Sequence, residues 1–174
     1  LEYQQLSSDS AVMGYEVVLV DDGSTDGTLE WLKLHKEEFP HVLAHSQNHM
    51  GPAAARNLGV EKATGDTIIF IDSDLVVRSD FLQAHADALV QGEKEIGNNC
   101  LFTYGAVINT GNFYHPTSEP YKLTDFSAAY FATGNVAIAT TWLEKAGLFD
   151  TRFQLHGWED LELGVRLQQL GLKL

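Results

Sequence analysis

The sequence predicts an α/β fold with a mostly parallel central sheet. Three short predicted strands, at 16–20, 42–45 and 67–71, are separated by two segments with helical spacing, at 28–39 and 53–63. Alternation of strand and helix along a chain is typical of parallel strands joined by right-handed crossovers. The segment 67–71 consists of β-branched and aromatic residues throughout, as expected for a strand buried on both faces.

The boundaries of several helices are marked by particular residues. Pro52 suits the first position of the helix that follows it. Thr141 and Glu144 have the spacing of a capping box that opens a short helix. Further elements are expected as a helix over 80–91, strands over 101–110 and 135–139, and a final helix over 158–170.

Length and composition limit the function classes. The chain has 174 residues, 44% of them hydrophobic, which fits one domain with a proper core. A net charge of −13 opposes sequence-independent binding to nucleic acid. The single cysteine, Cys100, excludes an internal disulfide and a cysteine-based zinc site.

Neither a membrane span nor a signal peptide is visible in the sequence. We therefore expect a cytoplasmic location, with peripheral membrane association of the full-length protein left open. The chain opens on Leu1 rather than Met, with 1–6 resembling the end of a helix, and it stops at 171–174, where a strand is expected to begin. We expect it to be a fragment of a longer protein.

Two carboxylates, Asp72 and Asp74, flank Ser73 directly after the strand at 67–71. The carboxyl ends of strands are where α/β sheets bind ligands. Acidic groups there are costly to bury unless a positive charge compensates them, and a divalent cation that carries phosphate oxygens is the simplest compensation. The alternative is that both carboxylates cap the next turn.

A nucleotide ligand would need three kinds of partner at this place. It needs an acceptor for a base N–H, partners for ribose hydroxyls and a counter-charge for the diphosphate. Asp22 suits the first role and Asp72 the second, while Asp74 with a metal, together with Arg56, suits the third. Alternatively, Asp21 and Asp22 form an Asx turn, and Arg56 is a solvated surface charge.

The segment 156–160 carries the most chemistry of the second half. Gly157 permits a close approach, and Trp158 offers a flat apolar face of the kind that stacks on sugar rings. Glu159 and Asp160 are either site carboxylates or charges that favour a helix N-terminus. His156 has no partner at metal-ligand spacing and is interpreted as structural.

Gly134 and Asn135, before a predicted strand, either line a substrate pocket or turn the chain.

Five of these stretches, in order, resemble the family 2 glycosyltransferases with the Rossmann-like GT-A fold. The stretch GWEDLELGVR also resembles galactosyl- and N-acetylgalactosaminyltransferases. The matching stretches are EVVLVDDGSTDGT at 16–28, NHMGPAAARNLGVEKATGD at 48–66, IIFIDSDLVV at 68–77, ATGNVAIA at 132–139 and GLFDTRFQLHGWEDLELGVRLQQLG at 147–171.

The resemblance implies a nucleotide-sugar-binding half at 1–95 and an acceptor-binding half at 96–174. In the first half, Asp22 would contact the base, usually uracil, and Arg56 would lie by the nucleotide. Asp72-Ser73-Asp74 would be the DxD motif, with Asp74 on Mn²⁺ or Mg²⁺, Asp72 near the ribose or the metal, and Ser73 among the donor-binding residues.

In the second half, Gly134 and Asn135 would face the sugar or the acceptor, and Trp158 and Glu159 would hold the acceptor. Asp160 would be the general base of an inverting transfer from a nucleotide diphosphate-sugar, a UDP-sugar first of all, to a hydroxyl of a glycan or another acceptor. The sequence departs from the family in lacking the usual first strand and a metal-binding histidine beyond the last helix.

Two other hypotheses remain. Asp72-Ser73-Asp74-Leu75-Val76 also fits the strand-end motif of haloacid-dehalogenase-type phosphatases, although a suitably placed lysine and a second acidic pair are missing. The chain is alternatively a non-catalytic nucleotide-sugar-binding module. The sequence does not predict the sugar, the acceptor, the oligomeric state or the activity of this fragment on its own.

Overall fold

The computed structural model describes most of the 174 residues. Within the described part, no helix is both long and apolar enough to cross a membrane. The described ranges are 1, 3–8, 10–97, 100–112, 114–118, 120, 122–125, 129–153 and 157–174.

Strands and helices alternate through the first half of the chain, as predicted. The strands are β1 (Val17–Asp21), β2 (Val42–Ser46), β3 (Thr67–Ile71), β4 (Phe102–Tyr104) and β5 (Asn135–Ala139). The α-helices are α1 (Thr28–Leu34), α2 (Pro52–Lys62), α3 (Phe81–Ile96), α4 (Thr140–Ala146) and α5 (Glu159–Gln169), with 3₁₀ turns at Lys36–Glu38 and Leu123–Asp125.

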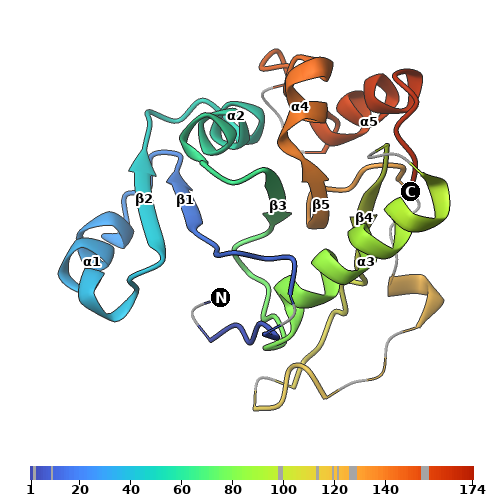
Figure 1. Ribbon diagram of the computed structural model, residues 1–174. Coiled ribbons are helices and arrows are strands. Elements are labelled where there is room, and N and C mark those ends of the chain that lie inside the picture. Colours follow the sequence, from blue (N-terminus) through green and yellow to red (C-terminus); the bar gives the residue numbers. More distant parts are fainter. Residues whose placement is uncertain are drawn as a thin grey trace.

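The strands form two separate sheets. β1 and β2 pair in parallel through the α1 crossover, whereas β5 lies between β3 and β4 and is antiparallel to both. Figure 1 shows the parallel pair with α1 at one end of the molecule and the second sheet with α4 and α5 at the other. The α/β class is confirmed, but the prediction of a mostly parallel sheet is wrong for the second sheet. The described part of the segment between β4 and β5 contains no crossover α-helix, which a parallel connection usually needs.

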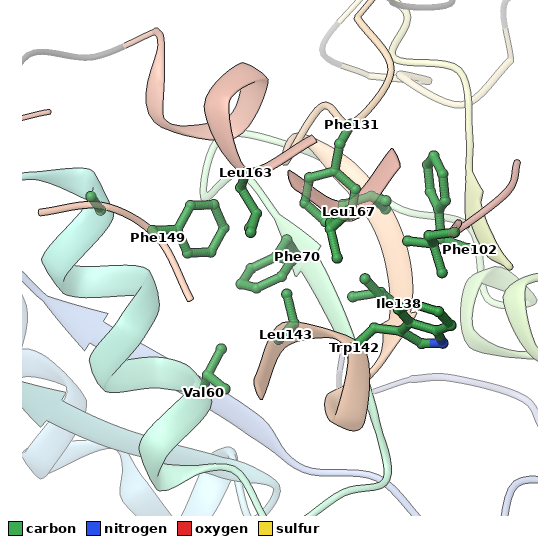
Figure 2. Packing of buried hydrophobic residues seen from close by; sticks show 13 residues of the cluster. Val60, Phe70, Phe102, Phe131, Ile138, Trp142, Leu143, Phe149, Leu163 and Leu167 are labelled. Atoms are coloured by element: carbon green, nitrogen blue, oxygen red, sulfur yellow. The ribbon is translucent and has the colours of Figure 1, made fainter. Parts of the chain in front are cut away.

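The hydrophobic core lies between the second sheet and the helices α4 and α5. Figure 2 shows Phe70 of β3 among Phe149, Leu163 and Leu143. The rings of Phe70 and Phe149 are perpendicular, with centroids 5.3 Å apart, a favourable arrangement for aromatic pairs. Val136 to Ile138 of β5 are completely buried. This half therefore supplies most of the apolar burial that stabilises the chain.

A cavity of about 710 Å³ lies where the two sheets are separated. It is lined by residues of β1 and β3 and by residues of α2 and α3, Arg56 and His85 among them. β1 and β3 are not paired with each other, so they do not form one continuous sheet. Helix α2 packs on β1, and its residues Ala53 and Val60 join the core cluster, so α2 connects the parallel pair to the second half.

Local predictions had mixed outcomes. Pro52 is the first residue of α2, as predicted. The capping box at Thr141 is wrong, because α4 starts one residue earlier without a side-chain cap and the Thr140 hydroxyl donates to the carbonyl of Gly65. Helix α3 runs past the predicted end and stops before Gly97, whose φ of 80° is the left-handed conformation that ends helices.

The ends of the chain also differ from expectation. Among the described residues before β1 no helix is present, so the helical interpretation of 1–6 is wrong. The strand expected at 171–174 is reduced to an isolated parallel bridge between Leu101 and Lys173. Glu162 and Arg166 form an i,i+4 ion pair on α5, with 2.6 Å between Oε2 and Nη2.

Replacing two helical glycines by alanine should change the free energy of unfolding in opposite directions. A Cβ at Gly59 of α2 would lie 3.6 Å from Val20, an ordinary contact, whereas at Gly164 of α5 it would lie 2.9 Å from the Cβ of Phe131. We expect Gly59→Ala to raise the free energy of unfolding by about 0.5–1 kcal/mol. Gly164→Ala should lower it by about 1–3 kcal/mol through overpacking. Urea denaturation measures both, and a Gly164→Ala variant as stable as the wild type would contradict the packing described.

Candidate active site

The DxD motif lies immediately after β3, beside the residue that precedes β5. Because Ile71 pairs with Asn135, the next residue, Asp72, comes to lie against Gly134, and its N–H donates to the Gly134 carbonyl at 3.4 Å. A Cβ on residue 134 would lie only 3.0 Å from Oδ2 of Asp72. The glycine therefore leaves room for this carboxylate. Asp72 and Asp74 are exposed, the side chain of Asp72 by 48%.

Asp22 follows the last residue of β1 and holds the loop that leads into α2. Its carboxylate accepts hydrogen bonds from Gln47 Nε2 at 2.7 Å, from the N–H of Met50 at 2.8 Å and from the N–H of Gly51 at 2.9 Å. Burial opposes ionisation, but these three hydrogen bonds and the nearby His49 hold the pKa of Asp22 below its ordinary value. The Asx-turn interpretation applies to Asp21, whose carboxylate accepts from the N–H groups of 23 and 24.

Arg56 of α2 lies between Asp72, after β3, and Glu159, at the start of α5. Its Nη1 donates to Oε1 of Glu159 at 2.6 Å, and its Nη2 lies 3.9 Å from Oδ1 of Asp72. The guanidinium also lies over the ring of Phe149, 5.7 Å from the centroid. One side chain thus brings Asp72 and Glu159, which are far apart in the sequence, close together. No local sequence pattern predicts that these two residues lie close together.

Glu159, the first residue of α5, is 1% exposed. Burial by itself would raise its pKa, but hydrogen bonds from its own backbone N–H, from Arg56 and from Gly157, together with the charge of Arg56, hold the pKa below its ordinary value. The neighbouring Trp158 is 65% exposed, and Asp160 is half-buried and accepts from the N–H of Leu161 at 2.8 Å. His156 lies outside the described residues.

The side chain of Asn135 contacts a residue that the sequence interpretation missed. His85 of α3 is buried; its Nε2 lies 2.9 Å from Oδ1 of Asn135 and its Nδ1 lies 2.7 Å from the Thr103 hydroxyl. Burial lowers the pKa of His85 and favours the neutral ring, and the contact with Asn135 partly offsets this effect. The signal in the sequence was a histidine at helical spacing from two apolar residues, four residues after Phe81 and four before Leu89.

The two exposed carboxylates of the DxD motif fit a divalent cation that shares its ligands with a substrate. In the part of the chain that the structure describes, no three His, Cys, Asp or Glu side chains gather as a metal site. Mg²⁺ is commonly held by one or two carboxylates, waters and substrate phosphates rather than by a cage of protein ligands. Asp72 and Asp74 would supply oxygen ligands of that kind.

A family model described as glycosyl transferase family 2 matches residues 7–147. The chain belongs to this family. The match leaves the phosphatase alternative without support. Among curated members, the uncharacterized glycosyltransferase YfnE of Bacillus subtilis is 24% identical over 91% of this chain and 54% of its own length.

Solved structures of other glycosyltransferases share the GT-A fold of this family 2 member. The crystal structure of GalNAc-T7 with UDP, GalNAc and Mn²⁺ aligns with a TM-score of 0.67 at 19% identity, over 90% of this chain and 35% of that one. Staphylococcus aureus TarS 1–349 in complex with UDP-GlcNAc aligns with a TM-score of 0.63 at 22% identity, over 95% of this chain and 46% of that one. The chain spans about half the length, or less, of the curated relatives it matches.

The ion pair of Glu159 predicts a pH dependence for the stability of this glycosyltransferase chain. Because the folded-state pKa of Glu159 is depressed, its contribution is present above the ordinary glutamate pKa and is lost as the pH falls through the folded value. We expect Glu159→Gln to be less stable than the wild type at pH 7, with a gap that narrows toward pH 3.

Urea denaturation at a series of pH values measures this gap in the free energy of unfolding. Glu144→Gln, at an exposed position of α4, is the control and should show no comparable gap. A gap for Glu159→Gln that stays constant between pH 7 and pH 3 would show that the ionisation of Glu159 does not stabilise the fold.

Proposed function

We propose that the complete protein is an inverting glycosyltransferase that moves a sugar from a UDP-sugar to a hydroxyl group of a glycan or a similar acceptor. The observation that carries this proposal is the placement of the exposed Asp72 and the start of α5 on the two sides of the Arg56 guanidinium. The carboxylate proposed for the donor and the helix start proposed for the acceptor would then lie close together, as a transfer between two bound molecules requires.

The donor would lie at the ends of β1 and β3. Asp72, Ser73 and Asp74 would hold its diphosphate and ribose, and Asp22 would lie on the side of the base. Mn²⁺ or Mg²⁺, held by Asp72 and Asp74, would neutralise the charge that develops on the departing diphosphate. The GalNAc-T7 structure with UDP and Mn²⁺ and the TarS structure with UDP-GlcNAc support this choice of donor and metal class.

The acceptor would lie at the start of α5, with Gly134 and Asn135 along the edge toward the donor. Trp158 offers an exposed indole on which a sugar ring can stack. Asp160 would take the proton of the acceptor hydroxyl while that oxygen forms its bond to the anomeric carbon and the bond from that carbon to the diphosphate breaks. A general base of this kind contributes roughly 10²–10⁴ in rate.

We expect Asp160→Asn in the complete protein to lower the transfer rate by about 10²–10⁴, because the amide cannot accept the hydroxyl proton. Binding of the UDP-sugar should stay within about twofold of the wild type, since Asp160 would not contact the donor. A transfer assay and calorimetric titration with the UDP-sugar measure the two quantities. Asp87→Asn, at an exposed position of α3, is the control.

Each outcome of this test has a distinct meaning. Unchanged transfer by Asp160→Asn would place the base elsewhere, and loss of donor binding would make Asp160 structural. A wild-type protein that binds UDP-sugars but transfers none would favour the non-catalytic binding module.

We expect Asp74→Ala to abolish the part of UDP affinity that depends on Mn²⁺, because one of two carboxylate ligands is removed. Titration of UDP into the chain with and without Mn²⁺ measures this part. The exposed Asp87→Ala is again the matched control. An unchanged Mn²⁺-dependent affinity in Asp74→Ala would contradict the assignment of this residue to the metal.

A further inference from the structure

Both oxygens of the Glu159 carboxylate accept hydrogen bonds from other groups of the protein. Oε1 accepts from Arg56 Nη1 at 2.6 Å, and Oε2 accepts from the N–H groups of Gly157 at 2.9 Å and Trp158 at 3.0 Å. A carboxylate offers about four acceptor positions, and three are filled here while the residue is 1% exposed. A side chain in this state has little left with which to bind an acceptor sugar.

The two N–H groups that Glu159 binds belong to the turn just before α5. Gly157 has a φ of 115°, and Trp158 is the N-cap of α5 without a side-chain cap of its own. Glu159 therefore reaches back to the turn, where it accepts from the N–H of the N-cap, which has no partner within the helix, and from the N–H of Gly157 just before it. The orientation of Trp158 and of the first turn of α5, with Asp160, depends on this contact.

Arg56 fixes the other side of the Glu159 carboxylate from a distant part of the chain. It lies on α2, and its second nitrogen, Nη2, is 3.9 Å from Asp72 Oδ1. Helix α2 is held in place independently of Arg56, because the Asn57 amide makes two hydrogen bonds with the backbone of Phe149, at 2.8 and 2.9 Å. The two terminal nitrogens of Arg56 thus face Asp72 and Glu159 from a helix that other contacts hold in place.

We propose that Arg56 and Glu159 are positioning residues that act as a pair: Arg56, held beside the DxD motif, sets the Gly157–Trp158 turn through Glu159 and thereby places Asp160 relative to the donor. The catalytic consequence rests on the proposed function, whereas the structural link does not. The pair differs from an ordinary surface ion pair, which is worth little, in that its carboxylate is buried and bound to backbone at the same time.

Hydrogen exchange in the chain of 174 residues tests the structural link without any substrate. In Arg56→Met we expect the amides of Gly157 and Trp158 to exchange about tenfold faster than in the wild type, because Glu159 loses its fixed partner. Amides of α2 and β5 should keep their rates, since the Asn57 contacts remain. Arg56→Lys, which keeps the charge without the fork, should show a smaller increase.

Arg78→Met is the matched control for this measurement. Arg78 pairs with Asp80 on the exposed surface, with 3.0 Å between Nε and Oδ1, so its loss should leave the exchange of Gly157 and Trp158 unchanged. Equal exchange of these two amides in Arg56→Met and in the wild type would overturn the proposal, as would an equal increase in Arg78→Met.

Kinetics of the complete protein test the catalytic consequence. For Arg56→Lys we expect kcat to fall by about 10²-fold and the KM for the acceptor to rise, with the affinity for the UDP-sugar within about twofold of the wild type. A loss of donor affinity with unchanged acceptor KM would instead make Arg56 a donor ligand. If the wild type transfers no sugar, the proposed function fails, and the exchange experiment still decides whether the pair sets the turn.

Discussion

A carboxylate buried as deeply as that of Glu159 requires a positive partner, and this requirement ties distant parts of the chain together. Arg56 can reach Glu159 only if α2 lies against the start of α5. Because β1 and β3 are not paired with each other, the packing of α2 on β1 then determines where the parallel pair sits relative to the second sheet. Breaking the ion pair would leave an uncompensated buried charge, which is strongly unfavourable.

Exposure separates the acidic residues of the site into two kinds. Asp72 has a half-exposed side chain and shares its surroundings with a glycine, so it can take up a ligand without losing a structural contact. Glu159 and Asp22 have carboxylates that already accept several hydrogen bonds from the protein. Acidic residues of the same kind therefore differ in how much of the carboxylate is left to accept a ligand, and this difference follows from their burial and hydrogen bonding.

Much of the fold could be predicted from local patterns. Short apolar segments and the turn residues that flank them marked β1, β2, β3 and β5 to within a residue or so, because strand composition and turn residues are local properties. The antiparallel direction of β5 could not be predicted, since it depends on the path of the long segment before it. The capping box at Thr141 failed because its hydroxyl-to-backbone geometry depends on where the helix starts.

The candidate site was predicted as a set of residues rather than as an arrangement. Asp72 and Gly134 were both predicted as site residues. Their contact follows from the register of β3 and β5, which the sequence pattern does not predict. The pairing of Arg56 with Glu159 and the contact of His85 with Asn135 likewise join segments far apart in the chain. Such contacts arise from tertiary packing, so the sequence analysis identified Arg56, Glu159 and Asn135 without their partners and missed His85.

The central position of β5 has a consequence for the order of folding. β1 and β2 can pair after closing only the segment 22–41, which holds α1, whereas pairing of β3 with β5 must close the segment 72–134. Longer loops cost more entropy to close, and contacts distant in sequence form more slowly. Asp72 meets Gly134 one residue beyond the last β3–β5 pair, so a nascent chain carries the DxD motif for some time before the motif has its neighbour.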